Sequence, residues 1–513
     1  MVFLHRTLPV KLIIICLSLC IGLPNTAYAI QMPGYDGGIK NDMEYKELFV
    51  LTGKPVILKG DIKINEGTMR KGKRQDRVNF TLESDDKNIS LRRNMTFEVS
   101  LEEDTKKRQY ITVSELTRFS ESITVKGEGR RSDRYKLEKC ELYSSTITDM
   151  APAVDYYSLN IRGKKLYSVN RDEGELSVEI NGSGVGYEHV WGATETVTLD
   201  YLIDYKGEKA IEESVYSADW NGSMQVVESF NTTRDLTYIP NEPSQISFRG
   251  GYLETIQDEQ VARYSYSLPR FDQKGIPLKS EFLKDDVELK LSTVPTQKRT
   301  FIPKTLDVPG HWAQEDIERL LSLGIMEPKG SYFGPHVYAK RLTFAQGVAK
   351  VTDIINRGKA IADVKKNVAQ KKGEALPQEE TPFSDISDKD MVYLENLAST
   401  GVMQGIGPKR FGPDQVLTRD QAITIMIRAL GLEHLAPNPP YDTGFADDCE
   451  IPAWARDSVY VARQIGLARG DMAGYFRPSD PMTKGEAAAF LNRFITYLQK
   501  DLKKDFKDRI INY

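Results

Sequence analysis

The chain has 513 residues, four cysteines and a formal net charge of −4 at pH 7. This length leaves room for two or three domains with hydrophobic cores of their own. A net charge this small excludes the strongly basic proteins that bind nucleic acid or anionic membranes through bulk electrostatics. We therefore expect neither nucleic acid nor a membrane surface as partner, and local patterns must indicate the function.

The first 29 residues have the pattern of a secretory signal peptide. Basic residues precede an apolar run over residues 12–23, and Ala27-Tyr28-Ala29 supplies the small residues of a cleavage site. The run is too short for an ordinary membrane span, and no later segment reaches the length of a transmembrane helix. Leu19 is too large to precede a lipidated Cys20. The sequence predicts a secreted protein whose mature chain begins at Ile30.

Residues 30–298 have the pattern of an all-β region built from antiparallel sheets. Apolar and polar residues alternate in segments that include 56–64, 78–82, 95–101, 176–180, 197–203 and 287–291. This period of two is typical of half-buried strands, and it leaves the strand order open. Asn181-Gly182 and Asn221-Gly222 predict turns, and the glycine-rich run 182–186 predicts a hairpin loop.

The β region offers few residues for catalysis. His189 is its only histidine, so a histidine-rich metal site is excluded, and no nucleophile-elbow motif is present. We predict no catalytic residue, no metal site and no cofactor. Paired carboxylates of a glycan hydrolase stay open, because the separation of two carboxylates is invisible in a sequence. Cys140 and Cys449 lie in different regions and are predicted to be free, buried thiols.

Residues 301–500 contain one pattern three times. Each copy has an aspartate, an amphipathic helix that ends at glycine, a Phe-x-Pro turn and a second helix that opens with threonine. The aspartates are Asp307, Asp385 and Asp447, the glycines are Gly324, Gly401 and Gly466, and the turns begin at Phe333, Phe411 and Phe476. Repeats of this length predict small units that bury their apolar faces against one another.

The second helix of each copy opens with Thr-x-x-Gln or Thr-x-x-Glu, which predicts a capping box. The three threonines are Thr343, Thr418 and Thr483. In this register the next position holds Phe344, Arg419 and Lys484, respectively. Free amides and the helix dipole favour an anion at a helix start, and an adjacent guanidinium can bind a carboxylate with two hydrogen bonds. The pattern therefore predicts anion binding in copies two and three, most strongly at Arg419.

These motifs resemble the S-layer homology family, whose modules tether surface proteins to bacterial cell walls. The resemblance implies an all-α bundle of three helix-loop-helix repeats, at residues 301–358, 381–436 and 441–500, with a charged linker at 359–380. It also implies binding of a secondary cell-wall polysaccharide, which is often pyruvylated, or of another glycan linked to peptidoglycan. The candidate binding residues are Asp307, Trp312, Asp385, Gly405, Arg419, Asp447, Trp454, Gly470 and Lys484.

Copy one departs from the pattern, because Pro328 stands where Gly405 and Gly470 stand in the other copies. For Trp312 and Trp454, stacking on a sugar and burial in the core are both open. The sequence predicts a surface or S-layer protein that displays the β region and is anchored non-covalently at the cell wall. A wall-anchored, carboxylate-dependent glycan hydrolase or esterase and an adhesin are the alternatives. Self-assembly of copies into a lattice is left open.

Overall fold

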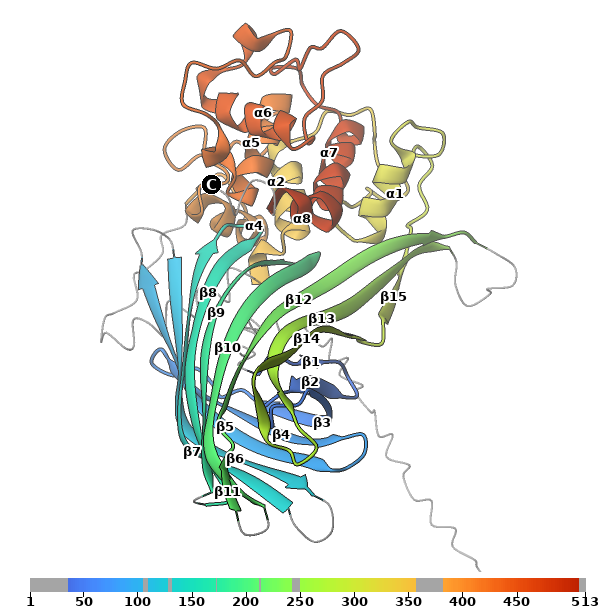
Figure 1. Ribbon diagram of the computed structural model, residues 1–513. Coiled ribbons are helices and arrows are strands. Elements are labelled where there is room, and N and C mark those ends of the chain that lie inside the picture. Colours follow the sequence, from blue (N-terminus) through green and yellow to red (C-terminus); the bar gives the residue numbers. More distant parts are fainter. Residues whose placement is uncertain are drawn as a thin grey trace, which may run out of the picture.

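The computed structural model describes residues 36–104, 109–127, 132–171, 173–211, 214–241, 250–356 and 382–506. The predicted signal peptide and the predicted linker at 359–380 lie outside these residues. Figure 1 shows a long, strongly curved sheet with the helices of the C-terminal region packed over one end. In the described parts of the chain, no helix combines the length and the apolar character needed to cross a membrane.

The N-terminal region forms a single antiparallel sheet of fifteen strands, which confirms the all-β expectation. The strands are β1 (Ile39–Lys40), β2 (Tyr45–Phe49), β3 (Val56–Asn65), β4 (Lys73–Ser84), β5 (Ile89–Asp104), β6 (Gln109–Lys126), β7 (Ser132–Met150), β8 (Asp155–Val169), β9 (Gly174–His189), β10 (Gly192–Ile211), β11 (Ser214–Ser217), β12 (Trp220–Ile239), β13 (Gly251–Phe271), β14 (Pro277–Ser292) and β15 (Thr296–Phe301). Neighbours in sequence pair from β1 to β10 and from β12 to β14, and β12 pairs with β10. The short β11 also pairs with β10, and β15 pairs with β13.

Period-two alternation explains which face of the sheet is buried. In β5, every second residue from Ile89 to Leu101 is buried, and the residues between them are exposed or half-buried. The inward set is apolar except for Arg93, which is therefore a charge placed inside the sheet. Segments predicted from the alternation lie in β3, β4, β5, β9, β10 and β14.

The predicted turns at Asn181-Gly182 and Asn221-Gly222, and the predicted loop at 182–186, are wrong. Residues 181–186 lie in the middle of β9, and Asn221-Gly222 lies in β12. The glycines of β9 serve close packing instead. A Cβ atom on Gly182 would lie 2.5 Å from a Leu199 methyl group, and one on Gly186 would lie 2.5 Å from the Tyr157 ring. Side chains of β8 and β10 therefore fill the space over the glycines of β9. Glycine is common in strands at such close approaches and where a sheet bends.

The first described residues, 36–49 with β1 and β2, lie inside the curve of the sheet (Figure 1) and are called the N-terminal segment below. β2 pairs with β3, whereas residues at β1 contact the far end of the sheet. The Lys40 amide donates to Gln260 Oε1 at 2.8 Å, and Asn41 Nδ2 donates to the Ser292 carbonyl at 3.2 Å. The segment thus links strands that are separated by most of the sheet.

The C-terminal region is helical. Its elements are α1 (Gln314–Ser322), α2 (Arg341–Val351), α4 (Asp388–Ser399), α5 (Arg419–Leu430), η2 (Glu433–Leu435), η3 (Asp448–Glu450), α6 (Ala453–Gln464), α7 (Lys484–Thr496), η4 (Tyr497–Asp501) and α8 (Leu502–Asp505). Gly324, Gly401 and Gly466 follow α1, α4 and α6 with φ of 66°, 77° and 78°. These left-handed conformations confirm the predicted glycine helix stops.

One hydrophobic core joins the helices to the end of the sheet, and a separate core lies within the curve of the sheet. Trp191, from the β9–β10 connection, is buried among apolar residues of the helical region, and its Nε1 donates to the Val351 carbonyl at 2.8 Å. Tyr156 of β8 stacks on Phe506 with ring centroids 6.0 Å apart. The last strand, β15, runs across the boundary that the sequence pattern placed after residue 298.

Cys140 and Cys449, the cysteines within the described residues, are free, as predicted. Cys140 is half-buried in β7, and burial raises the pKa of its thiol to about 12. Cys449 is exposed in η3, so the prediction of burial is wrong for this residue. None of the three residues of η3 is buried, so this short turn lies at the surface.

Candidate anchoring site

Each of the three aspartates holds the turn of its own repeat. The two carboxylate oxygens of Asp307 accept from the amides of Phe333 and Gly334 at 2.9 and 2.6 Å. Asp385 and Asp447 make the same pair of bonds with the turns at Phe411 and Phe476, at 2.6 to 2.8 Å. Partial burial acts to raise the pKa of Asp307 and Asp385, but these amide hydrogen bonds together hold it below the usual range.

A ring of three backbone hydrogen bonds joins the repeats just before their second helices. The Ala339 amide donates to the Met482 carbonyl, the Met482 amide to the Leu417 carbonyl, and the Leu417 amide to the Ala339 carbonyl, at 2.8 to 2.9 Å. Each of these residues stands two positions before a helix start. The ring therefore shows that Arg341, Arg419 and Lys484 occupy the same structural position in the three repeats.

The register predicted for repeat one is wrong by three residues. Arg341, not Phe344, occupies the helix start that Arg419 and Lys484 occupy in the other repeats. Phe344 is buried in the core one turn further along α2. The Leu342-Thr343 pair copies the local sequence of Leu417-Thr418. Each helix-start cation nevertheless stands eight residues after the phenylalanine of its own turn, and this spacing agrees with the hydrogen bonds between repeats.

The predicted capping box is present only in repeat three. Thr483 accepts from the Glu486 amide, and the Glu486 carboxylate accepts from the Thr483 amide. In repeat two, Thr418 is the N-cap, but its hydroxyl donates to Asp420 instead. In repeat one, Thr343 lies inside α2 and Lys340 is the N-cap. The prediction is therefore wrong for repeats one and two.

The three helix-start cations each lie over a phenylalanine ring of another repeat. The guanidinium carbons of Arg341 and Arg419 lie 5.1 and 5.5 Å from the Phe411 and Phe476 centroids, respectively. Lys484 Nζ lies 4.2 Å from the centroid of the Phe333 ring. Each phenylalanine belongs to a turn held by an aspartate, so the cation–phenylalanine contacts run from repeat one to two, two to three and three to one. We call these three contacts the junctions.

The junctions differ in how much of the cation is available to a ligand. Arg341 is buried, and its two Nη groups donate to Gln421 Oε1 and to the Gln404 carbonyl at 3.2 and 3.0 Å. Arg419 is half-buried and uses Nε for the Phe476 carbonyl at 2.9 Å. Among the described residues, its Nη groups have no hydrogen-bond partner, and they are the free donors that a carboxylate would need.

The third junction offers a weaker cation. Lys484 Nζ donates to the Phe333 carbonyl, and burial lowers the pKa of the ammonium group. The His311 ring lies tilted against the Trp312 ring, with centroids 5.4 Å apart, and meets the His336 ring edge to face at 4.8 Å. A Cβ atom on Gly485, next to Lys484, would lie 2.8 Å from His311 Cε1. Aromatic rings thus gather beside Lys484.

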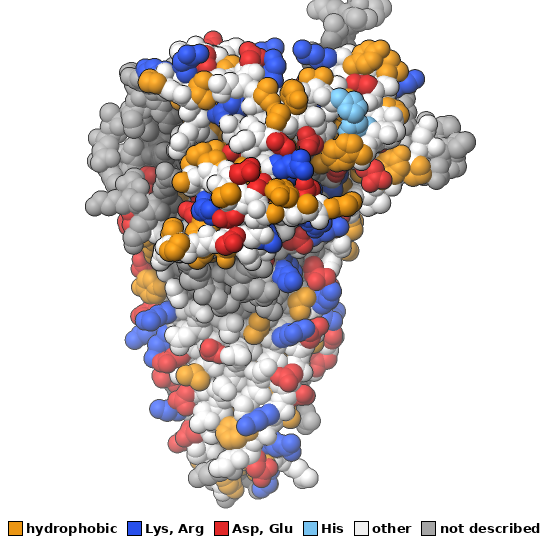
Figure 2. Space-filling view, turned by 90° about the horizontal axis from the view of Figure 1, so that it is seen from above, with side chains coloured by type: hydrophobic (Ala, Val, Ile, Leu, Met, Phe, Trp, Pro, Cys, Tyr) orange, Lys and Arg blue, Asp and Glu red, His pale blue; other side chains and the backbone are white. Residues whose placement is uncertain are grey.

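Trp312 and Trp454 are 67% and 50% exposed, so neither is a core residue. Gly405 and Gly470 lie in tightly packed loops, where a Cβ atom would approach the Arg410 carbonyl oxygen at 2.5 Å and the Gly474 carbonyl carbon at 2.9 Å. Packing within the loop is therefore sufficient to require glycine at both positions. Figure 2 shows basic, acidic and hydrophobic side chains interspersed over the helical end, without a large patch of one sign.

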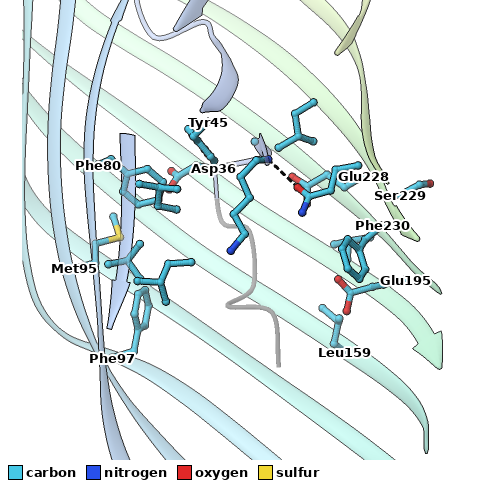
Figure 3. Close-up of a pocket in the computed structure, with 18 residues that line it drawn as sticks. Asp36, Tyr45, Phe80, Met95, Phe97, Leu159, Glu195, Glu228, Ser229 and Phe230 are labelled. Atoms are coloured by element: carbon cyan, nitrogen blue, oxygen red, sulfur yellow. Dashed lines mark hydrogen bonds between the residues drawn. The ribbon is translucent and has the colours of Figure 1, made fainter. Parts of the chain in front are cut away.

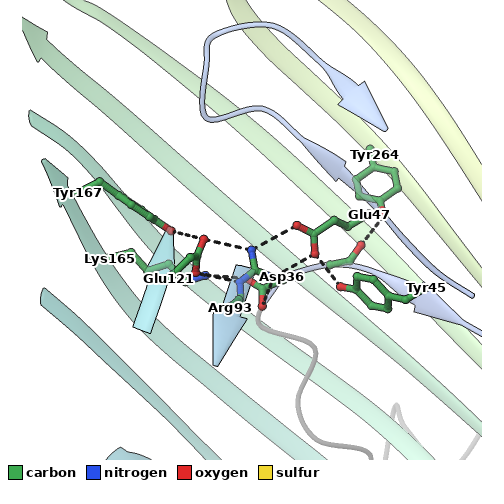
Figure 4. Close-up of polar contacts among 9 residues, drawn as sticks. Asp36, Tyr45, Glu47, Arg93, Glu121, Lys165, Tyr167 and Tyr264 are labelled. Atoms are coloured by element: carbon green, nitrogen blue, oxygen red, sulfur yellow. Dashed lines mark hydrogen bonds and ion pairs between the residues drawn. The ribbon is translucent and has the colours of Figure 1, made fainter. Parts of the chain in front are cut away.

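Sequence reasoning missed a cluster of charges inside the sheet. Arg93 contacts carboxylate oxygens of Asp36, Glu47 and Glu121 at 2.8 to 3.1 Å. Lys165 lies 2.6 Å from Asp36, and Tyr167 donates to Glu121 at 3.0 Å (Figure 4). The available signal was a charged residue at an inward position of the alternation, as at Arg93 in β5.

This charge cluster holds the N-terminal segment in place. Asp36 and Glu47 come from that segment, whereas Arg93, Glu121 and Lys165 come from β5, β6 and β8. Three carboxylates face two cations. Burial raises the pKa of Glu47, helped by the charge of Asp36 and opposed by Arg93.

Comparison with known proteins identifies the helical region. Residues 305–345, 382–423 and 444–488 match the S-layer homology domain. A cell surface protein of Thermoanaerobacter kivui is 34% identical over 125 residues, which are 24% of this chain and 16% of that protein. The surface-layer 125 kDa protein of Lysinibacillus sphaericus is 31% identical over 109 residues, or 21% of this chain and 9% of that protein. An exoglucanase of Acetivibrio thermocellus is 28% identical over 188 residues, or 36% of this chain and 16% of that protein.

The chain spans less than a fifth of the length of each of these relatives. Each segment that matches the domain begins just before a turn-holding aspartate and ends just after a helix-start cation. The matched segments therefore contain the residues that form the three junctions. The three C-terminal repeats therefore match the S-layer homology domain in sequence.

Proposed function

We propose that this protein is a secreted bacterial surface protein that its three repeats hold non-covalently on a cell-wall polysaccharide. S-layer homology repeats place the chain at the cell surface. The curved sheet is the part displayed. Two of the relatives are named as surface proteins, which supports an S-layer-type role. The observation that carries the proposal is the set of three junctions within the matched segments.

In this proposal the repeats form a bundle with pseudo-threefold symmetry around the hydrogen-bond ring of Ala339, Leu417 and Met482. The Arg419 junction is the main binding position, because it combines a helix start with a half-buried guanidinium whose Nη groups make no hydrogen bond to the described residues. Its ligand is an anionic group of the wall polysaccharide, such as the carboxylate of a pyruvyl substituent. Trp454 and Trp312 supply exposed rings for sugar faces.

The test is cosedimentation of the mature chain with wall sacculi that retain or lack their secondary polysaccharide. We expect binding only to sacculi that retain it. Arg419→Ala should weaken binding roughly ten- to a hundredfold, the effect of losing a charge-assisted hydrogen bond. Arg428→Ala is the matched control, because Arg428 lies on the same helix and pairs with Glu433 instead.

Two outcomes contradict different parts of the proposal. If the parent chain fails to bind sacculi that carry the polysaccharide, anchoring through this polymer is wrong. If folded Arg419→Ala binds as well as the parent, anchoring stands and the Arg419 junction is not the binding position.

A wall-anchored glycan hydrolase and an adhesin are the alternatives for the β region. The exoglucanase among the relatives is similar over part of its length only, so it does not decide between them. A hydrolase would release soluble glycan from purified walls, whereas a displayed structural region or an adhesin would release none. The assay is run on the mature full chain, because the sheet and the helices share a core.

A further inference from the structure

A cavity of about 110 Å³ lies inside the curve of the sheet. Apolar side chains of β3, β4 and β5, among them Phe80, Met95 and Phe97, form one wall. Glu195 of β10 and Glu228 of β12 lie on the opposite side, together with Phe230 (Figure 3). The cavity thus has a hydrocarbon wall facing two carboxyl groups.

The strand register explains why the two carboxyl groups share a face. Glu228 pairs with Val197, and Glu195 pairs with Phe230. The two glutamates are therefore diagonal neighbours on adjacent strands, a relationship that puts Cα atoms about 7–8 Å apart. No hairpin or loop intervenes, so their spacing is set by the sheet itself.

Among the described residues, one of the two carboxyl groups has a hydrogen-bond donor, and the other has a buried oxygen without one. Tyr157 of β8 donates to Glu195, reaching across Gly186, which has no side chain to block it. Glu228 Oε1 is fully buried and has no hydrogen-bond partner in the described parts of the chain. An unsatisfied buried oxygen costs free energy, which a ligand that donates to it would recover.

The surroundings favour the uncharged form of both groups. Burial raises the pKa of Glu195, and burial with the nearby Glu195 raises the pKa of Glu228 well above its usual range. Other titratable groups that face Glu228 are Asp36 and Lys40 of the N-terminal segment, Tyr201 of β10 and Tyr264 of β13. Lys40 is the one cation among them, and its own attractive partners are Glu66 and Asp258.

We propose that this cavity binds a small amphiphilic cation, an alkyl chain that carries an ammonium group. The apolar wall takes the chain, and the ammonium group donates hydrogen bonds to Glu228 and Glu195. Glu228 transfers its proton to solvent water when the cation binds, so a neutral acid becomes an ion pair and no bond of the ligand changes. A cavity of about 150 Å³ accommodates benzene, so a chain of roughly four carbons suits this volume.

A sugar ring is a poorer fit, because its hydroxyl groups would face the apolar wall without hydrogen-bond partners. Retaining and inverting glycosidases also need one ionised carboxylate beside one protonated acid. Here burial favours the protonated form of both glutamates. The inference is independent of the proposed wall anchoring, which rests on the helical region.

The test uses the mature chain with ¹³C-methyl-labelled methionine, in which Met95 reports directly on the cavity. Its signal is assigned by its loss in Met95→Leu. n-Butylammonium should shift the Met95 signal with at least tenfold higher affinity than 1-butanol, and this affinity should fall as the pH is lowered. Glu228→Gln should weaken butylammonium binding at least tenfold and leave butanol binding unchanged. Glu179→Gln, on the exposed face of β9, should change neither.

The remaining methionine signals show whether each variant is folded. Glu195→Gln repeats the test on the second carboxyl group and should also weaken butylammonium binding. Equal affinity for the two probes, an unmoved Met95 signal, or unchanged butylammonium binding in both folded glutamine variants would overturn the proposal.

Discussion

Arg419 lies over the ring of Phe476, and its Nε donates to the carbonyl oxygen of the same residue at 2.9 Å. One guanidinium therefore connects the second helix of repeat two to the turn of repeat three. That turn is itself held by Asp447. Nε is used in this contact, and the two Nη groups remain available to an anion. An ammonium group has a single nitrogen and cannot bind both partners through separate nitrogen atoms.

We therefore predict that Arg419→Lys weakens wall-polysaccharide binding although the charge is retained. Lysine lacks the planar, two-pronged donor set, so the affinity should fall by roughly tenfold, toward the lower end of the effect expected for alanine. Cosedimentation with sacculi measures the change. Arg428→Lys on the same helix should bind as the parent does, and equal binding by Arg419→Lys would show that charge alone matters.

The aspartates that hold the turns should matter for stability. In Asp385→Asn, one carboxylate oxygen is replaced by an NH₂ group that faces the Gly412 amide, so a hydrogen bond becomes a donor–donor contact. We expect a loss of about 1–3 kcal/mol in the free energy of unfolding. Urea unfolding measures it, and Asp388→Asn, at an exposed carboxylate in α4, is the control.

The same hydrogen bonds predict a pH dependence. The pKa of Asp385 is lower in the folded chain than its usual value, so this carboxylate stabilises the fold above the usual pKa. That contribution is lost as the pH falls through the lower, folded-state pKa. Asp385→Asn should therefore lose less stability than the parent on acidification through this range. An identical acid dependence in both proteins would contradict the assignment.

The middle residue of the Phe-x-Pro turn has a left-handed backbone, which favours glycine. Gly412 has φ of 74°, whereas its counterpart in repeat three is Arg477 with φ of 57°. Gly412→Ala adds a side chain to a left-handed residue and a Cβ atom 2.9 Å from Ile406 Cδ1. We expect it to cost about 1–2 kcal/mol, since left-handed conformations cost L-residues that much. Arg477→Ala should cost less than Gly412→Ala, because residue 477 already carries a side chain in the left-handed conformation and its ion pair with Asp471 is exposed.

Thermal or urea unfolding of these two variants gives the comparison. Equal losses for the two variants would show that backbone conformation does not explain the glycine in repeat two.

Local patterns predicted the strands and the helix stops because each depends on neighbouring residues only. Alternation in residues 95–101 is enough to place β5, and Gly401 is enough to end α4. The glycines of β9 show where local patterns fail. Glycine is favoured both in tight turns and in strands where neighbouring side chains approach closely, so the residue type alone does not distinguish the two. The distinction comes from Tyr157 and Leu199 on the neighbouring strands, whose side chains occupy the space that a Cβ atom on Gly186 or Gly182 would need.

The register of repeat one follows from a longer comparison, whereas the charges inside the sheet depend on distant partners. Local similarity favours Phe344, but the eight residues from Phe333 to Arg341 match the spacing in the other two repeats and identify the true register. Arg93 finds Glu47 and Glu121 across 46 and 28 residues of sequence. No spacing rule identifies such partners, although an arginine in an inward position indicates that some must exist.

The cluster around Arg93 yields the last prediction. Arg93 is buried, and its removal would leave Asp36, Glu47 and Glu121 with Lys165 as the remaining cation of the cluster. Breaking a buried ion pair by removing one partner typically costs about 3–5 kcal/mol, because the other charge stays buried and unpaired. We therefore expect Arg93→Met to lower the free energy of unfolding by about this amount. Urea unfolding followed by circular dichroism measures it.

Arg92→Met is the matched control, since Arg92 is the neighbouring residue of β5 and points outward into solvent. An exposed substitution of this kind should change stability by no more than about 0.5 kcal/mol. The loss in Arg93→Met should also shrink at low pH, where protonation of the three carboxyl groups removes the uncompensated charge. Equal stability of the two variants at neutral pH would mean that the N-terminal segment is held by its apolar contacts, such as Phe49, and not by the charges.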